Sequence, residues 1–469
     1  MVPSLLLVFL LNFSDVFFAV AEQTWTIHVP GLSQNASISN IRPPRWSDYD
    51  APTPGVVVNV ATENDVLVTV QFCIAENIPF LAQNGGHGWS STLDNLMQNG
   101  VLINLRGLNS VTFSADKTKA TVGGGAIISD VINAAYAEGV QVETGNCNCV
   151  GALGAALGGG YGNLIGLTGL AVDNILSMNV VMADGSLHTI TSKNEDLFWA
   201  LRGAGPNFGI VTSAVLIAYP VTPDQNLAWQ GSLGFTQDKI ESLVQAINDL
   251  VLQPKMNIFL YYANSGTPTV IINVFYYGNE TQGKAAFASI YAIGPYFDGT
   301  SVLAYPHWND GTDAAGDCIN GGRKPAYGAG LAKMVPTTWR AIWNEYVSFI
   351  SVPGAENSLV ALEAYSLFKA RSVPDSSSSF PFRSTVNFNG FVVPWYNDSS
   401  LDPQALAFGS KVRDLWRSTD DLASNSTYIN FAHGDEPLPT VYGGNVARLQ
   451  GLKVEYDPHG RFNNWFPLS

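Results

Sequence analysis

The alternation of apolar and polar residues predicts short strands and helices in the first half of the chain. Residues 55–61 (GVVVNVA) predict a buried strand, and the apolar periodicity of residues 63–76 predicts the helix that follows it. Further elements are predicted in order as strands at 79–83, 101–103 and 120–122, a helix at 127–138, and a strand at 174–183 with a turn at Asp184-Gly185. This order predicts an α+β fold.

Longer strands and amphipathic helices are predicted between residues 221 and 425. Residues 257–263 and 269–278 flank a short loop and predict a hairpin. The other elements predicted here are helices at 237–252, 281–293, 337–349 and 403–416 and strands at 359–367 and 386–395. A run of serines at 376–379 predicts a flexible loop. The region therefore predicts an antiparallel sheet backed by helices.

Length and charge limit the classes of partner. The chain has 469 residues, more than one typical domain, and should divide into two with sizeable cores. Only 13% of the residues are charged, and the formal net charge is −15. Because a negative chain repels phosphate backbones and anionic lipids, neither nucleic acid nor a membrane surface is an expected partner.

The first residues resemble a secretion signal. An apolar run over residues 3–21 ends in Ala-Val-Ala, the small-x-small pattern of a signal peptidase site, so we expect cleavage after Ala21 and a secreted protein. Polar residues interrupt the run and no basic residue precedes it, which leaves a membrane-tethered or buried segment as the alternative. Asn-x-Ser/Thr sequons suit a secreted glycoprotein and lie at Asn35, Asn279, Asn397 and Asn425.

The chain has four cysteines. Cys147 and Cys149 are too close in sequence to bridge each other easily. Cys73 and Cys318 can pair, but Cys73 lies in the helix predicted at 63–76, where a buried small hydrophobe is the favoured interpretation.

Glycine is concentrated beside cysteine in residues 145–174 (GNCNCVGALGAALGGGYGNLIGLTGLAVDN). Without Cβ atoms, such a backbone can place its N–H groups against a flat ring or a phosphate. The stretch contains no GxGxxG frame, so a Rossmann interpretation is weak. Close contact with a cofactor and a turn that serves only packing both remain open on this stretch alone.

Three separated motifs point to one family. They are GGH at Gly85–His87, GxCxxVG at Gly145–Gly151 followed by GGGYGN and VDN, and YGGNVARL…KxxxDPxxxF from Tyr442 to Phe462. With these motifs the chain resembles the berberine-bridge-enzyme-like FAD-linked oxidases of the vanillyl-alcohol-oxidase superfamily, and more closely their secreted fungal branch. The resemblance implies a two-part PCMH-type FAD-binding domain at 22–220 and 426–469, with an inserted substrate domain at 221–425.

The resemblance also implies a covalently bound FAD. His87 matches the histidine that the family links to the flavin 8α-methyl, and Cys147 matches the cysteine linked to flavin C6, with Cys149 as the competitor. Backbone N–H groups of Gly85 and Gly86 are expected to wrap the pyrophosphate. The remaining cofactor positions implied are Asn84, Gly88, Val150, Gly151, Gly154, Gly160, Ile210 and Asn430.

Some positions depart from the family pattern. Gln83 and Asn84 stand where many relatives carry Arg or Lys, so the phosphate contact is expected to depend on backbone dipoles. Trp89 replaces a tyrosine usual in plant relatives, and an indole cannot act as a base. Ala155 stands where the family usually has a histidine.

Two residues are candidates for the catalytic base. Tyr428 belongs to a family-matched Tyr-x-Asn element with Asn430, and we expect neighbouring donors and positive charge to lower the pKa of its phenol from about 10. Glu363 is the rival, because it lies on the strand predicted at 359–367 with Tyr365 on the same face. An exposed carboxylate without function is the alternative for Glu363.

The resemblance implies a secreted FAD-dependent oxidase that moves hydride from a substrate C–H bond to flavin and reduces O₂ to H₂O₂. Its expected partners are O₂ and a small molecule, which can be an alcohol, a sugar or a secondary-metabolite intermediate, and we expect a monomer. A flavin-bound isomerase or cyclase, a dehydrogenase and a binding protein on a relic fold are the alternatives. No metal is expected, because the six histidines show no HExxH spacing, and GxSxG and GxxxxGK[ST] are also missing from the sequence.

Overall fold

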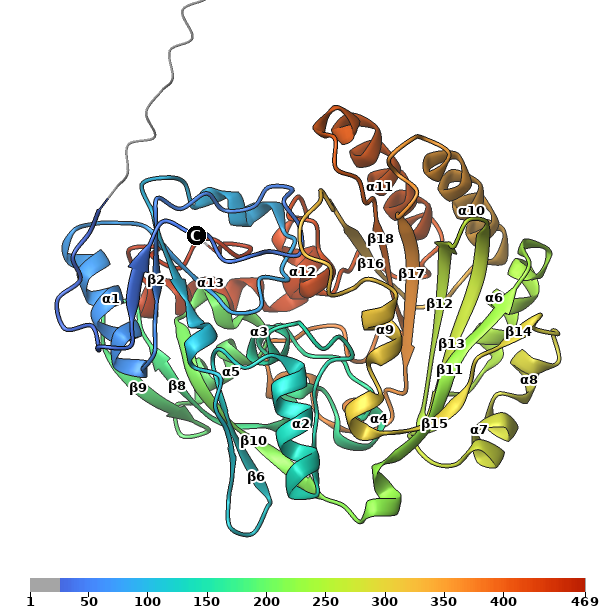
Figure 1. Ribbon diagram of the computed structural model, residues 1–469, viewed down its shortest axis with the longest axis horizontal. Coiled ribbons are helices and arrows are strands. Elements are labelled where there is room, and N and C mark those ends of the chain that lie inside the picture. The colour runs from blue at the N-terminus through green and yellow to red at the C-terminus, as the bar shows by residue number, and fades with distance from the viewer. Residues whose placement is uncertain (1–25, 469) are drawn as a thin grey trace, which may run out of the picture.

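A computed structural model describes residues 26–468 (Figure 1). The expected signal peptide and its cleavage site lie outside the described residues. Within the described part of the chain, no helix has both the length and the apolar character needed to span a bilayer.

The first sheet has four strands in the order β1-β2-β4-β3. Its strands are β1 (Ser37–Ser39), β2 (Val56–Asn59), β3 (Phe80–Gln83) and β4 (Val101–Asn104). The helix α1 (Glu63–Ala75) follows β2 and begins with a capping box, in which Thr62 accepts a hydrogen bond from the backbone N–H of Asp65. These elements confirm the strands and helix predicted at 55–83, and β3 ends where the GGH motif begins.

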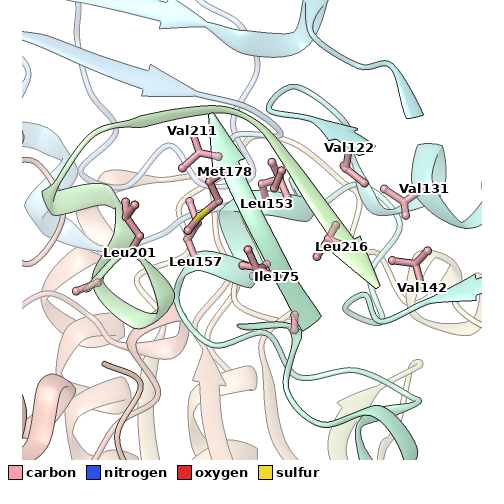
Figure 2. Packing of buried hydrophobic residues seen from close by; sticks show 14 of the residues in the cluster. Val122, Val131, Val142, Leu153, Leu157, Ile175, Met178, Leu201, Val211 and Leu216 are labelled. Carbon is pink, nitrogen blue, oxygen red and sulfur yellow. The ribbon is translucent and has the colours of Figure 1, made fainter. Parts of the chain in front are cut away.

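The second sheet has the strand order β5-β6-β10-β8-β9, with β7 paired to β10. Its strands are β5 (Val111–Phe113), β6 (Lys119–Gly123), β7 (Val140–Val142), β8 (Ile175–Val181), β9 (Leu187–Thr191) and β10 (Ile210–Pro220). Its helices are α2 (Ile128–Glu138), α3 (Ala152–Leu157), α4 (Ile165–Thr168) and α5 (Glu195–Ala204). Figure 2 shows the core between them, where Met178 and Leu216 of the sheet point toward Leu153 and Leu157 of α3. Burial of this core fixes the central glycine stretch in place.

The third sheet is entirely antiparallel, in the order β14-β11-β13-β12-β17-β18-β16, with β15 also on β11. Its strands are β11 (Leu227–Phe235), β12 (Met256–Asn264), β13 (Pro268–Tyr276), β14 (Phe297–Asp298), β15 (Ser301–Ala304), β16 (Tyr327–Leu331), β17 (Leu359–Tyr365) and β18 (Phe388–Val393). The hairpin predicted at 257–278 is β12–β13.

Helices cover one face of the third sheet, and the other face turns toward the first two sheets (Figure 1). The helices of this region are α6 (Ile240–Asp249), α7 (Glu280–Ala286), α8 (Ala288–Tyr291), α9 (Asp310–Ala314), α10 (Pro336–Ile350) and α11 (Asp402–Arg417). Along β12, Leu260 and Tyr262 belong to the core under these helices, whereas Phe259 and Tyr261 belong to a separate cluster on the opposite face. The period of two therefore decides which side chains lie under the helices and which face the first two sheets.

The last part of the chain returns to the second sheet. It contains α12 (Leu438–Tyr442) and α13 (Val446–Tyr456), drawn in red beside the blue and green elements of Figure 1. Tyr442, Leu449 and Phe466 are buried in the same core as α3 and α5. We call the first two sheets with residues 426–468 the first lobe, and the third sheet with its helices the second lobe.

Two local predictions differ from the structure. The helix predicted at 281–293 is two short helices, α7 and α8, because Phe287 between them is fully buried with a non-helical backbone. The serine run predicted as a flexible loop is partly buried: Ser378 accepts a hydrogen bond from Arg383 at 3.0 Å, and Ser379 donates one to the carbonyl of Ala200 at 2.9 Å. Buried hydroxyls in folded proteins are normally hydrogen-bonded, as these two are.

Candidate active site

The GGH loop and the GxCxxVG loop lie in backbone contact. A Cβ atom at Gly85 would lie 2.6 Å from the carbonyl oxygen of Cys149, and one at Gly86 would lie 2.7 Å from that of Pro44. Gly86 also has a φ of +69°, which other residues rarely adopt. Glycine is therefore required at position 85 for the two loops to meet, and at position 86 for the GGH loop to pack against Pro44.

His87 is held in one orientation and one protonation state. Its Nε2 lies 2.9 Å from the carbonyl oxygen of Asp317, and its ring stacks on Trp46 with centroids 5.1 Å apart. Because a carbonyl can only accept, Nε2 carries the proton and Nδ1 keeps its lone pair. Burial lowers the pKa of His87 to about 4, and the charges of Lys324 and Arg45 act in the same direction. The imidazole is therefore neutral at physiological pH.

Cys147 lies beside His87, with its Sγ 3.9 Å from Nε2. Burial raises the pKa of the Cys147 thiol well above its ordinary value, so the sulfur is protonated. Cys149 forms a disulfide with Cys318, and the free cysteines are Cys73 and Cys147.

The pairing of Cys73 with Cys318 that the sequence allowed is therefore wrong. Cys73 is fully buried in α1, as its favoured interpretation held, and Cys318 reaches Cys149 because the segment around it crosses to the first lobe. That crossing is a tertiary feature that the cysteine spacing could not reveal.

Glu363 lies on the face of β17 that is turned toward the first lobe. Tyr365 lies on the same face, as strand phase predicted, and its hydroxyl donates to Oε2 of Glu363 at 2.9 Å. The side-chain amide of Asn146 donates to the Tyr365 hydroxyl at 3.0 Å. Burial, with a smaller contribution from the nearby Asp317 carboxylate, raises the pKa of Glu363 to about 8. The alternative of an exposed carboxylate is therefore wrong. Hydrogen bonds through Tyr365 link the Glu363 carboxyl to Asn146, the residue before Cys147.

Tyr428 lies at the edge of the same site. Its phenol oxygen accepts hydrogen bonds from the backbone N–H of Gly160 at 3.0 Å and from the Asn430 amide at 2.7 Å. Burial nevertheless raises its pKa well above the ordinary value, and the Glu363 carboxyl adds to that rise. The predicted lowering is wrong, because two donors do not compensate for the loss of water around a buried phenolate.

The glycines of the central stretch make close contacts with this tyrosine. A Cβ at Gly158 would lie 2.3 Å from Asn430, and one at Gly159 would lie 3.2 Å from the Tyr428 ring. Gly160 has a φ of +77° and presents its N–H to the phenol. This part of the stretch therefore serves packing and also positions a candidate catalytic side chain.

The other expected cofactor positions are spread more widely. The amide of Asn84 donates to the carbonyl of Ala126 at 2.8 Å, and Gly151 packs against the same side chain. The Oδ1 of Asn84 is buried and has no hydrogen-bond partner among residues 26–468. Val150 is half-buried next to Gly151, and Gly88 packs against Trp465. Gly154 lies in α3, and Ile210 is buried in the apolar cluster of the first sheet.

Sequence reasoning missed two cations at this site. Arg45 donates to the Gln83 side chain at 2.7 Å and to the carbonyl of Gly88 at 2.6 Å, so it brings to the GGH loop the positive charge that Gln83 and Asn84 lack. Lys324 is fully buried and donates to the carbonyls of Trp46 and Ile319. Neither residue belongs to a local motif, so no sequence signal could have identified it.

Comparison with known proteins identifies the family. A family described as "FAD binding domain" matches residues 54–191, and one described as "Berberine and berberine like" matches residues 427–465. An FAD-linked oxidoreductase of Pyricularia oryzae is 33% identical over 442 residues, which cover 91% of this chain and 86% of the relative. One of Gibberella zeae is 34% identical over 474 residues, covering 94% and 92%. The chain belongs to the berberine-bridge-enzyme-like FAD-linked oxidoreductases.

Solved structures agree in fold with this family member. A xylooligosaccharide oxidase from Myceliophthora thermophila superposes with a TM-score of 0.79 at 21% identity, covering 91% of this chain and 94% of that one. A berberine-bridge-enzyme-like protein from Physcomitrella patens gives 0.80 at 19% identity, covering 93% and 97%. These structures confirm the α+β fold class. The oxidoreductase assignment is confirmed by the relatives of 33% and 34% identity, and FAD is the cofactor of the family domain that matches.

The residues of this chain fit an FAD. Gly85 and Gly86 follow a parallel strand and pack without side chains against neighbouring backbone, and Asn84 beside them has a buried Oδ1 that lacks a partner in the described part of the chain. A neutral imidazole and a thiol lie side by side at His87 and Cys147. A buried hydrogen-bonding oxygen without a protein partner, beside two nucleophilic side chains, is what a bound ring cofactor would need here.

Proposed function

We propose that this oxidoreductase is a secreted oxidase that removes hydride from a substrate C–H bond beside a hydroxyl or amine and reduces O₂ to H₂O₂. The substrate is a small alcohol, a sugar or a secondary-metabolite intermediate. The observation that carries the proposal is that His87 and Cys147 lie together in the first lobe, while Asn146, the residue before Cys147, donates a hydrogen bond to Tyr365 of the Glu363–Tyr365 pair in the second lobe. When bound, FAD supplies the hydride acceptor and the two-electron reaction with O₂.

We further propose that His87 and Cys147 both hold the cofactor covalently. A neutral His87 with a free lone pair on Nδ1 supports the first link. For the second, Cys147 is preferred to Cys149, whose sulfur is bonded to Cys318. A cofactor fixed by two bonds needs less enclosure by protein, which suits a site between two lobes.

The proton that leaves with the hydride goes to Glu363 in this proposal. A carboxyl with a pKa near 8 has useful basicity at neutral pH, whereas the Tyr428 phenol has its pKa raised and already accepts two hydrogen bonds. Tyr428 keeps its own proton and donates it to the reacting oxygen or nitrogen, which orients the substrate carbon. Each residue therefore has one role, as acceptor or as donor.

The domain boundaries and the location of the protein are also proposals. Division at 220/221 and 425/426 is supported by the end of β10 at Pro220 and by the return of the chain from Ile429 to the core of the first lobe. Secretion is supported by the Ala-Val-Ala site, and the four sequon asparagines are all exposed.

The test of this function is to mix the purified protein with candidate substrates, including xylobiose, which the Myceliophthora protein binds, and benzyl alcohol. Bleaching of the flavin without O₂, followed by stoichiometric H₂O₂ once air is admitted, is the expected result. Product formed while the flavin stays oxidised would replace the oxidase by an isomerase or cyclase. Bleaching that O₂ does not reverse would make the protein a dehydrogenase.

A further inference from the structure

A segment of the second lobe crosses the candidate flavin site. We call residues 309–324 the strap; it begins with α9, which lies between the two lobes (Figure 1). On the Cys147 side, the hydroxyl of Thr312 donates to the carbonyl of Asn146 at 2.9 Å, and the amide of Asn148 donates to the Asp313 carboxylate at 2.6 Å. These contacts tie the strap to both neighbours of Cys147.

The strap also contacts the elements around His87. The N–H of Gly321 donates to the carbonyl of Arg45 at 2.9 Å, and the N–H of Asp48 donates to the carbonyl of Gly322 at 2.9 Å. Between these two regions, the carbonyl of Asp317 receives the Nε2 proton of His87. The strap thus supplies the group that fixes which imidazole nitrogen is free.

One covalent bond anchors the strap at this point. Cys318, the residue after Asp317, forms the disulfide with Cys149 across 169 residues of sequence. The neighbouring backbone is permissive, because Gly316, Gly321 and Gly322 all have positive φ. Hydrogen bonds hold both ends of this glycine-rich segment, and the disulfide adds a covalent tether next to Asp317, which limits how far the Asp317 carbonyl can shift.

The same bond decides which sulfur is free. The Sγ of Cys147 lies 3.5 Å from that of Cys149, so the two sulfurs are in contact and occupy the same part of the site. In the disulfide, Cys149 has no thiol to offer. If Cys318 were absent, Cys149 would become a second thiol at nearly the same position.

We propose that the Cys149–Cys318 disulfide directs flavin attachment, because it fixes the carbonyl that orients His87 and withholds Cys149 from competing with Cys147. Cys149 and Cys318 are positioning residues, since neither bonds to the cofactor. This inference rests on the covalent FAD of the proposed function.

The attachment reactions balance with O₂ as oxidant. At His87, the Nδ1 lone pair forms an N–C bond that replaces one C–H bond of the flavin methyl group. The methyl hydrogen leaves as a proton, its electron pair reduces the flavin, and the imidazole becomes neutral again when Nε2 releases its own proton. At Cys147, an S–C bond replaces the ring C–H bond at C6, the thiol and ring hydrogens leave as protons, and the flavin again takes two electrons. O₂ reoxidises the flavin after each step and becomes H₂O₂.

The experiment uses the full chain from riboflavin-limited cultures, mixed with FAD in air. Covalent attachment is followed as flavin fluorescence on denaturing gels, total flavin is measured separately, and peptide mass spectrometry locates each link. Cys318→Ala should slow attachment at His87 by ~10-fold to 10²-fold, in line with a misplacement of about 1 Å, and should move part of the sulfur link to Cys149. Cys73→Ala, which removes a cysteine outside the site, should attach at the wild-type rate.

A double variant separates the two effects. In Cys149→Ala/Cys318→Ala the slow attachment at His87 should persist, while the sulfur link should appear on Cys147 alone. Wild-type rates and positions in both variants would overturn the inference. If the variants fold poorly, wild-type protein reduced with a phosphine before FAD is added provides the second test, and equal rates with and without reductant would refute it. If the wild-type protein instead releases all its flavin in acid, the covalent attachment of FAD on which the inference rests is refuted.

Discussion

The proton acceptor gives the sharpest test of the chemistry. If Glu363 is the base, flavin reduction by a saturating substrate must depend on the fraction of Glu363 that is ionised. With a pKa of about 8, that fraction is about 1% at pH 6 and about 90% at pH 9, so the rate should rise about 90-fold across this interval. At its ordinary pKa of 4.5 the carboxyl would be ionised throughout, and the same profile would be flat.

The assay is anaerobic stopped-flow mixing, with flavin absorbance followed from pH 6 to pH 9. Glu363→Gln should be slower by about 10²-fold to 10⁴-fold at pH 9, because general-base catalysis typically contributes that much, and its profile should lose the step near pH 8. Tyr428→Phe is the matched control at the neighbouring position. It should be slower at every pH through poorer orientation of the substrate, yet keep the step.

Two results would refute this reasoning. A step that survives in Glu363→Gln would assign the titration to another group. A step that disappears in Tyr428→Phe, with Glu363 intact, would return the role of base to Tyr428, as the Tyr-x-Asn motif had suggested.

Four further predictions test the structure and the proposals. Glu363 stays protonated in the folded state while it ionises in the unfolded state, so the stability of the wild type should fall as pH rises from about 4.5 to about 8. Over that window the melting temperature of the wild type should drop relative to that of Glu363→Gln. The same pH dependence of the melting temperature in both proteins would contradict this. Asp173→Ala should lower the free energy of unfolding in urea by about 3–5 kcal/mol, because it leaves the buried guanidinium of Arg383, 2.9 Å from the Asp173 carboxylate, without its ion-pair partner. A decrease of less than about 1 kcal/mol would argue against that ion pair. Acid-denatured wild type should stay yellow, and His87→Ala and Cys147→Ala should each keep one covalent link to flavin. Only the double variant should release all its flavin. If Cys149→Ala rather than Cys147→Ala abolishes the C6 link, the linked cysteine is Cys149. Expressed in a eukaryotic host, the protein should begin at Glu22 and lose mass on deglycosylation, whereas an intact N-terminus in the cytosol would refute secretion.

The sequence determined the family, the fold class and the candidate attachment residues. His87 and Cys147 could be named in advance because each belongs to a short motif whose glycines are needed where the loops meet, and such motifs are local. The phase of β17 likewise placed Glu363 and Tyr365 on one face, because alternation is a property of every extended strand. The hairpin β12–β13 followed from the same local pattern.

Only the tertiary structure decided the environment of those residues. Burial sets the pKa of Glu363 and of Tyr428, and burial depends on the packing of the second lobe against the first. The partner of Cys149 lies 169 residues away on the strap, and no spacing rule links the two. Arg45 hydrogen-bonds to the GGH loop although it belongs to no motif. Its contact depends only on where the fold places its segment, so its position in the sequence does not predict it. The sequence determines which reactive side chains stand in local motifs. Exclusion of water from those side chains and the pairing of distant cysteines arise only when the lobes pack together.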